Sequence, residues 1–235
     1  MKIKKILIKD NKKFYWSKGD LHTEFGVVKE KKLEKSIVKT HLNKELEVLE
    51  ASFLDNLEKI KRGPAIILKK DIGFILTNTD ISKNSIILEA GTGSAHLTIH
   101  LSRFCKKIYS YEKNKNFHEI AKKNIESFEV KNITLKNESI ENSKEKNIDI
   151  AILDLPNPEE IIPKIEKTLK NSAYLVTYLP TTNQLIRLLE NIKGFIHIKT
   201  SEIIEREWQT FENRVRPKSQ MIAHTAFLSV FRKIE

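Results

Sequence analysis

Two glycines and two acidic side chains follow apolar segments of this 235-residue chain, where they could bind a small ligand. Gly91 and Gly93 come directly after the apolar run 85–90, and Glu112 ends the next apolar run about twenty residues later. Glycine lets a backbone approach a ligand closely, and an acid at this spacing accepts hydrogen bonds from ribose hydroxyls. These residues predict a nucleoside-containing cofactor, although a Gly-x-Gly turn by itself is also found as a tight structural turn.

Position 96 distinguishes between the possible cofactors. The dinucleotide fingerprint GxGxxG requires a third glycine there, and this chain has His96. Close packing of a helix against a pyrophosphate is therefore not expected, which disfavours NAD. S-adenosylmethionine fits better because it contains a ribose but no phosphate.

A second acidic turn follows the apolar run 148–153, where Asp154 precedes a rigid Pro156-Asn157-Pro158 sequence. The carboxyl ends of parallel strands face the ligand crevice, so Asp154 is expected at the same sheet edge as the glycine turn. There it could accept hydrogen bonds from the exocyclic amine of a base and help to remove a displaced proton. Asp154 is therefore the leading catalytic candidate; the alternative is that it only caps the following helix.

Apolar segments alternate with amphipathic helical stretches from about residue 63 onward. The strand-like runs are 85–90, 107–111, 132–136, 148–153 and 173–179. This alternation predicts an α/β fold with a parallel sheet covered by helices on both faces. Two later extended stretches, 195–206 and 221–233, predict a closing β-hairpin at the sheet edge.

The N-terminal part has a different pattern. Short alternating runs broken by glycines and charges predict a small β domain. Residues 46–60 then show apolar side chains every three or four positions, which predicts a linking helix. We therefore expect two domains, a β domain with this helix at 1–62 and a ligand-binding domain at 63–235.

Charge and cysteine content restrict the function classes. The chain has 42 Lys and Arg against 31 Asp and Glu, a formal charge of +11, which suits a polyanionic partner or simply a well-solvated surface. The single cysteine, Cys105, permits no intrachain disulfide and indicates a cytoplasmic protein. No apolar run approaches the about 20 residues of a membrane span, and the histidines lack metal-ligand spacing, so neither membrane nor metal is expected.

Several motifs together resemble the tRNA (adenine-N1)-methyltransferases of the TrmI family. They are LEAGTGS at 88–94, YEKN at 111–114, LDLPNP at 153–158, YLPTTNQ at 178–184 and RVRPKSQMIAHTAFLSVFRK at 214–233, with GDLHTEFG at 19–26 and an RG…KKD pattern at 62–71. The resemblance covers nearly the whole chain and implies a class I Rossmann-like methyltransferase domain with an N-terminal module that helps to hold tRNA. It also implies a homotetramer that methylates N1 of the T-loop adenine at tRNA position 58, with position 57 also used by archaeal members.

The resemblance further implies roles for matching residues. The expected cofactor-binding residues are Glu89, Gly91, Thr92, Gly93, Ser94, Glu112, Glu138 and Asp154. Within this set the glycine turn would line the methionine part of S-adenosylmethionine, Glu112 would hold the ribose, and Asp154 would serve adenine. Glu138 would replace the aspartate that usually contacts the cofactor's adenine. Tyr178 would join Asp154 as a catalytic residue by helping to form the target-base pocket.

Besides Glu138, the chain departs from the family pattern at four positions. Ala95 replaces a glycine, Ala65 and Leu68 replace a glutamine and a tyrosine, and Glu159 replaces an aromatic residue. Ala95 and Leu68 keep open the alternative of a noncatalytic tRNA-binding subunit. A class I methyltransferase acting on a protein or small molecule is the other alternative, which the net charge and the N-terminal domain disfavour.

Basic and aromatic residues gather near the last hairpin. They include Arg206, Arg214, Arg216 and Lys218, with Trp208 and Phe211 between them. This mixture suits phosphate contact and base stacking, so these four cations are the expected RNA-binding residues. A solvated loop or a contact between subunits is the alternative.

Overall fold

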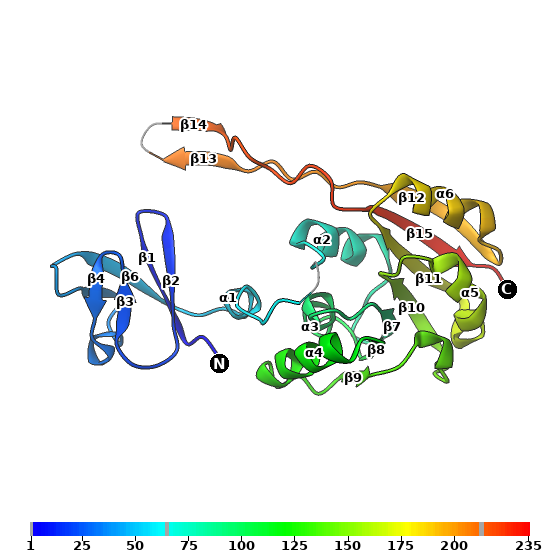
Figure 1. The fold of residues 1–235 in the computed structure, drawn as a ribbon, viewed down its shortest axis with the longest axis horizontal. Coiled ribbons are helices and arrows are strands. Elements are labelled where there is room, and N and C mark those ends of the chain that lie inside the picture. Colours follow the sequence, from blue (N-terminus) through cyan, green and yellow to red (C-terminus); the bar gives the residue numbers. More distant parts are fainter. Residues whose placement is uncertain (1, 64–65, 212–213) are drawn as a thin grey trace. The chain divides into compact units, whose positions relative to one another are not determined.

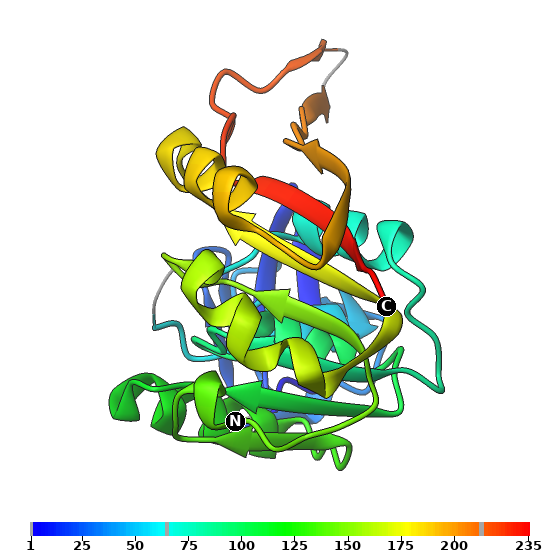
Figure 2. The same ribbon diagram turned by 90° about the vertical axis from the view of Figure 1, so that its right-hand side faces the viewer.

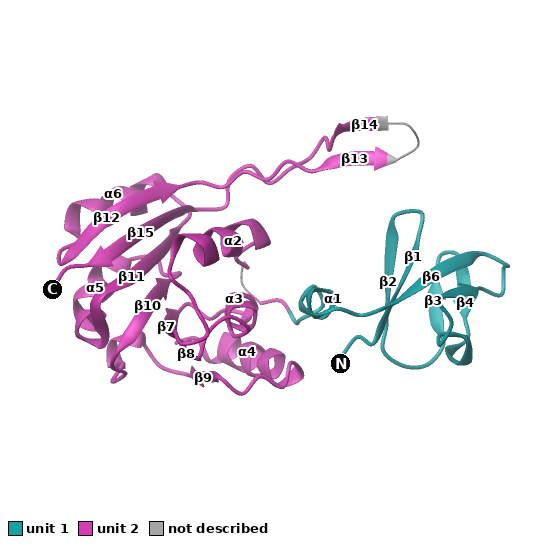
Figure 3. Cartoon of the chain, turned by 180° about the vertical axis from the view of Figure 1, so that it is seen from behind, with its two compact units in different colours: residues 1–61 teal, residues 62–235 magenta. Residues whose placement is uncertain are grey.

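The computed structural model describes residues 2–63, 66–211 and 214–235, without the side chains of Phe211 and Arg214. The chain divides into two compact units, Met1–Lys61 and Arg62–Glu235, which Figure 3 shows in different colours. This division lies one residue from the domain boundary proposed from the sequence.

The first unit is a small antiparallel β structure. Its main sheet has the strand order β2-β1-β6-β5, formed by β1 (Lys5–Lys9), β2 (Lys12–Trp16), β5 (Ile37–Lys39) and β6 (Glu45–Glu50). A short hairpin of β3 (Leu21–Thr23) and β4 (Gly26–Val28) and the 3-10 helix η1 (Glu30–Lys32) complete it. Its core contains Leu7, Trp16, Val28, Leu33, Val38, Leu46 and Val48, all of which are buried.

The prediction of a linking helix over residues 46–60 is wrong for the first part of that range. Residues Glu45–Glu50 form β6, which pairs with β1, and only α1 (Phe53–Leu57) is α-helical. Leu46 and Val48 are buried while their sequence neighbours are exposed, as period-two alternation requires. The helix α1 begins only after Ser52, which is its N-cap: the Ser52 side chain accepts a hydrogen bond from the backbone N–H of Asp55 in a capping box.

The second unit is built on a seven-stranded sheet with the order β12-β15-β11-β10-β7-β8-β9 (Figure 1). The strands are β7 (Ile86–Ala90), β8 (Lys107–Tyr111), β9 (Ile133–Lys136), β10 (Ile148–Leu153), β11 (Leu169–Leu179), β12 (Phe195–Ser201) and β15 (Phe227–Lys233). The run from β11 to β9 is parallel, and β15 is antiparallel to both of its neighbours. The α/β fold class predicted from the sequence is thus confirmed.

Helices cover both faces of this sheet. They are α2 (Lys69–Asn78), α3 (His96–Leu101), α4 (Lys115–Ser127), α5 (Pro158–Ile165) and α6 (Thr182–Asn191), with the short 3-10 helices η2 (Ile140–Asn142) and η3 (Glu166–Thr168). Apolar residues of α5 and α6 pack in one core cluster, and those of α2 and α3 pack in another on the opposite face. Figure 2 shows α5 and α6 on one side of the sheet and α2 on the other.

The closing strands differ in one detail from the sequence prediction. β12 and β15 do pair with each other, but β15 lies inside the sheet beside β11 and only β12 is at the edge. The chain between them carries a second, separate hairpin, β13 (Trp208–Phe211) and β14 (Arg214–Pro217). In Figures 1 and 2 this hairpin extends away from the seven-stranded sheet.

Candidate active site

The glycine turn after β7 is wedged between the ends of two neighbouring strands. Gly91 has φ +90°, and a Cβ on it would lie 2.2 Å from the carbonyl oxygen of Asp154, which follows β10. The backbone N–H of Gly91 donates to the carbonyl of Tyr111 at the end of β8, at 3.1 Å. Only glycine fits here, because any side chain would separate the turn from Asp154.

Glu112 joins the glycine turn to the strand beside it. One carboxylate oxygen accepts the backbone N–H of Gly93 at 2.9 Å, and the other accepts the backbone N–H of Asn114 at 2.9 Å. The side chain is buried, yet each oxygen retains a free lone pair after this single bond. Glu112 can therefore still accept hydrogen bonds from a pair of ligand hydroxyls.

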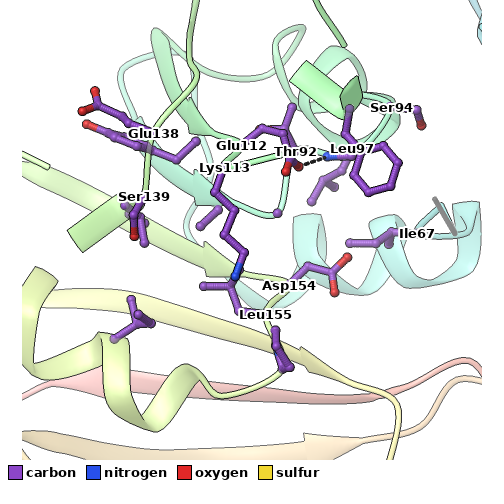
Figure 4. Close-up of a pocket in the computed structure, with 18 of the residues that line it drawn as sticks. Ile67, Thr92, Ser94, Leu97, Glu112, Lys113, Glu138, Ser139, Asp154 and Leu155 are labelled. Carbon is purple, nitrogen blue, oxygen red and sulfur yellow. Dashed lines mark hydrogen bonds between the residues drawn. The ribbon is translucent and has the colours of Figure 1, made fainter. Parts of the chain in front are cut away.

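A cavity of about 460 Å³ opens at the carboxyl edge of the sheet. Seven of the predicted cofactor residues line it, namely Gly91, Thr92, Gly93, Ser94, Glu112, Glu138 and Asp154. Figure 4 shows Glu112 and Asp154 at the same hollow, with Ile67 and Leu97 among the apolar residues around it. The structure thus brings together residues that follow the ends of four strands, β7, β8, β9 and β10.

Asp154 is the acidic group in this cavity with the fewest protein partners. Its carboxylate is half-buried, and among the described residues no side chain donates a hydrogen bond to it. Burial, reinforced by the charge of Glu112, raises the pKa of Asp154 to about 7. This carboxylate is therefore available to a ligand and poised to gain or lose a proton near neutral pH.

Glu89 lies behind the cavity wall and does not line the cavity. Its Oε2 accepts hydrogen bonds from the hydroxyls of Thr98 and Ser110, each at 2.7 Å, and burial raises its pKa to about 7. Ser110 also shares a 2.6 Å hydrogen bond with Thr92. Glu89 therefore lies beneath the glycine turn and supports it. The sequence prediction was that Glu89 binds the cofactor directly.

A buried polar network holds the segment that contains Glu138. Glu145 accepts hydrogen bonds from Tyr111 at 2.5 Å, from Lys136 at 2.5 Å and from Ser143 at 2.6 Å. Burial opposes ionisation of Glu145, but these hydrogen bonds outweigh it and lower its pKa to about 2. The network therefore fixes both ends of the segment that forms one side of the cavity.

Tyr178 does not line the cavity but lies beside Asp154 at the sheet edge. Leu153 pairs with Thr177 across the parallel strands β10 and β11, so the next residue on each strand is Asp154 and Tyr178. The half-buried Tyr178 donates its hydroxyl hydrogen to Asp71 at 3.4 Å, and burial with the Asp71 charge raises its pKa to about 12. No role was predicted for Asp71, although it lies in the KKD motif, because its partner is distant in sequence.

The departures from the family pattern have distinct structural settings. Ala95 precedes α3 with φ +62° and is fully buried, so it adopts the left-handed conformation usual for the glycine it replaces. Leu68 caps the start of α2 without a side-chain hydrogen bond, and Glu159 pairs with Arg187. Ala65 lies outside the described residues.

The cavity suits a ligand that combines a cationic centre, hydroxyl groups and an apolar ring. Its lining contains five acidic residues, one lysine and several apolar side chains; the charged residues are Glu112, Lys113, Glu138, Glu141, Asp154 and Glu160. Burial lowers the pKa of His96 to about 4, which leaves that histidine neutral. The hydroxyl oxygen of Ser94 is buried and makes no hydrogen bond within the described part of the chain, so it is free for a ligand. These features fit S-adenosylmethionine. Across the described ranges, no group of three or more His, Cys, Asp or Glu could hold a metal ion.

The predicted RNA-binding cations lie on the separate hairpin and its approaches. Arg206, Arg216 and Lys218 are exposed, whereas the side chain of Arg214 is outside the described structure. Arg216 donates to Gln209 at 3.1 Å, and Lys218 pairs with Glu207. None of the helices in the described ranges is long and apolar enough to span a membrane.

Comparisons with known proteins are consistent with this site. A family described as tRNA methyltransferase complex GCD14 subunit matches residues 58–231. The chain is 32% identical to the tRNA (adenine(57)-N(1)/adenine(58)-N(1))-methyltransferase TrmI of Methanocaldococcus jannaschii, over 97% of this chain and 94% of that protein. Two solved structures are similar over 99% of this chain. The tRNA (m1A58) methyltransferase TrmI from Aquifex aeolicus has a TM-score of 0.88, 28% identity and 97% of its own chain covered. A SAM-dependent O-methyltransferase from Thermotoga maritima has a TM-score of 0.90, 29% identity and 93% of its own chain covered.

Proposed function

The chain belongs to the tRNA (adenine-N1)-methyltransferase family, and on that premise we propose that it methylates N1 of adenine 58 in the tRNA T-loop, and of adenine 57 as well. The M. jannaschii relative is named for both positions and the A. aeolicus relative for position 58 alone. The higher identity to the archaeal enzyme supports the dual assignment. One observation carries the proposal: the carboxylate of Asp154 lies beside the glycine turn, and no side chain in the described ranges donates a hydrogen bond to it.

S-adenosylmethionine, when bound, supplies an electrophilic methyl group on a sulfonium. Gly91, Thr92, Gly93 and Ser94 would surround its methionine part, Glu112 would accept from the ribose hydroxyls, and Glu138 would serve its adenine ring. Glu89 would support the glycine turn indirectly, because its carboxylate accepts hydrogen bonds from Thr98 and Ser110 beneath the turn.

Asp154 would orient and stabilise the target base. Attack by N1 makes the adenine cationic, and a carboxylate near the exocyclic amine stabilises that developing charge. A pKa of about 7 leaves Asp154 ionised at slightly alkaline pH, where it can accept from the amine and take up a proton. The target base lies within a folded loop, so part of the tRNA binding energy is needed to expose it.

The exposed hairpin would contact the phosphate backbone of tRNA. Arg206 and Arg216 are exposed cations on either side of Trp208, which is 54% exposed. Phosphate contacts release counterions, so binding should weaken strongly with salt. Replacing both arginines by alanine should reduce the slope of log affinity against log salt by about two. An unchanged slope would assign the hairpin to another role.

We also propose a cytoplasmic homotetramer. Exposed apolar side chains on α6 and the edge strand β12 support burial between subunits; they are Ile186, Leu189, Ile196 and Ile198. Light scattering at micromolar concentration tests this arrangement: a mass of four chains is expected, and a monomer would contradict it.

The activity is tested with labelled S-adenosylmethionine and unmodified tRNA, followed by nuclease digestion and mass spectrometry. We expect N1-methyladenosine at positions 58 and 57, lost in Asp154→Ala and retained in Asp80→Asn, which changes an exposed acid outside this cavity. Tight tRNA binding without methyl transfer would instead identify a noncatalytic subunit. The retained glycine turn and acids argue against that outcome.

A further inference from the structure

A buried polar cluster lies behind the edge of the active site. It consists of Lys70 and Asp71 on α2, Tyr178 at the end of β11, and Thr225 before β15, and we call it the Asp71 cluster. Asp71 is completely buried, and the side chain of Lys70 is 4% exposed. An ion pair at this depth has a large desolvation penalty and adds little to stability, so its presence beside an active site calls for another explanation.

Hydrogen-bond directions in this cluster follow from the chemistry of its members. Lys70 can only donate, and its Nζ lies 2.8 Å from Asp71 Oδ1 and 2.6 Å from Thr225 Oγ1. Thr225 therefore accepts from the lysine and donates its own hydrogen to Asp71 Oδ2, at 2.9 Å. The cluster is thereby ordered in one direction, because every other hydrogen bond in it ends on the carboxylate of Asp71.

This order determines what Tyr178 can offer to a substrate. A phenol has one hydrogen, and that of Tyr178 points to Asp71 Oδ2 at 3.4 Å. Its oxygen retains only acceptor capacity for any further partner. Leu153 pairs with Thr177, so Asp154 and the half-buried Tyr178 are the next residues on two neighbouring strands. The sheet edge therefore presents two neighbouring acceptors, a carboxylate and a phenol oxygen.

The segment that carries Thr225 is itself anchored at this edge. His224 Nε2 lies 2.8 Å from the carbonyl oxygen of Pro180, directly after β11, and its Nδ1 contacts Glu202. Thr225 contacts Lys70 and Asp71 on α2, and the residue before it is fixed against Pro180 and Glu202. The cluster joins three elements that are far apart in the chain.

We propose that Asp71 is a positioning residue that makes Tyr178 a hydrogen-bond acceptor, so that Tyr178 and Asp154 together receive the two hydrogens of the target's exocyclic amine. This inference rests on the proposed function and deepens it. Adenine carries that amine, whereas guanine and hypoxanthine carry an acceptor oxygen at the same position, which would face two acceptors. The Asp71 cluster therefore selects adenine over the other purines.

The test compares two tRNA substrates, one with adenosine and one with purine riboside at position 58, which lacks the amine but keeps N1. Position 57 carries a pyrimidine in both, so that only one site can react. Wild-type protein should prefer adenosine in kcat/KM by at least about tenfold per hydrogen bond. Tyr178→Phe and Asp71→Asn should each lower this preference about tenfold, with the Kd for S-adenosylmethionine unchanged. In the double variant Asp71→Asn should add nothing, because it acts through Tyr178.

A second pair of variants covers the case in which Asp71→Asn does not fold, since it leaves Lys70 buried beside a neutral partner. Thr225→Val removes one hydroxyl with little change in shape and should lower the preference severalfold, and Thr225→Ser should restore it. Equal effects of Thr225→Val in the wild-type and Tyr178→Phe backgrounds would overturn the proposal and assign the cluster a structural role. An unchanged preference in Tyr178→Phe would overturn it too. Failure of the wild-type protein to methylate the adenosine substrate would instead refute the proposed function.

Discussion

Replacing Asp154 with asparagine should stabilise the protein while it removes most of the activity. A pKa raised from 3.8 to about 7 corresponds to about 4 kcal/mol of unfavourable free energy for the ionised form, at about 1.4 kcal/mol per pKa unit. The carboxylate is half-buried in an open cavity, so water screens it and we expect about half of this value. Asp154→Asn should therefore raise the free energy of unfolding at pH 8 by about 2 kcal/mol.

The sign of the pH dependence follows from proton binding. Because the pKa of Asp154 is higher in the folded than in the unfolded state, the folded protein binds more protons between pH 3.8 and about 7. The destabilisation by Asp154 is complete above pH 7 and shrinks as pH falls towards 4. The advantage of Asp154→Asn should follow the same course, largest at pH 8 and much smaller at pH 5.

Urea unfolding without ligand, followed by far-ultraviolet circular dichroism at pH 8 and pH 5, measures this difference. Methyl transfer to tRNA by the same variant should fall about 100-fold in kcat/KM, since an amide cannot take up charge or a proton. Asp80→Asn, at an exposed position, should change neither quantity. An Asp154→Asn variant less stable than wild type at pH 8 would refute the reasoning that this carboxylate is held against its own ionisation.

Two other substitutions test the supports of the cavity. Gly91→Ala places a Cβ 2.2 Å from the carbonyl oxygen of Asp154, so it should lower the free energy of unfolding by about 3 kcal/mol and abolish binding of S-adenosylmethionine in calorimetry. Gly19 has φ +73° and open space around it, so Gly19→Ala should lower the free energy of unfolding by only about 1 kcal/mol. Equal losses in the two variants would refute the steric argument. Glu145→Gln should lose about 2 kcal/mol at pH 7 in urea unfolding. Its folded pKa of about 2 is depressed, so that loss should shrink as pH falls from about 4.5. Glu141→Gln breaks an exposed pair and should change stability by less than about 0.5 kcal/mol; a loss as large as that of Glu145→Gln would contradict the role of burial.

Local patterns predicted the parts of the site that depend on neighbours in sequence. The run 85–90 followed by two glycines, and the runs that end at Glu112 and Asp154, predicted three strand ends at one sheet edge, and the structure has them there. Such predictions succeed because parallel strands leave the sheet on the same side whatever their order.

Features set by pairing between distant segments were not predictable. The segment Glu45–Glu50 satisfies both the helical and the alternating period, and its pairing with β1 decides for the strand. The position of β15 between β11 and β12 is set when the sheet assembles, and the order of the elements along the chain does not indicate it. The bond between Tyr178 and Asp71 joins residues 107 positions apart, so no motif connects them.

The close approach of Gly91 to Asp154 bears on attempts to make this enzyme accept enlarged cofactor analogues. A wider glycine turn would push against the backbone of Asp154 and so displace the carboxylate. Space for a bulkier transferable group must therefore be created elsewhere on the cavity wall. Ile67 and Leu97 are suitable positions, because shortening either side chain enlarges the hollow and leaves the contact between turn and acid intact.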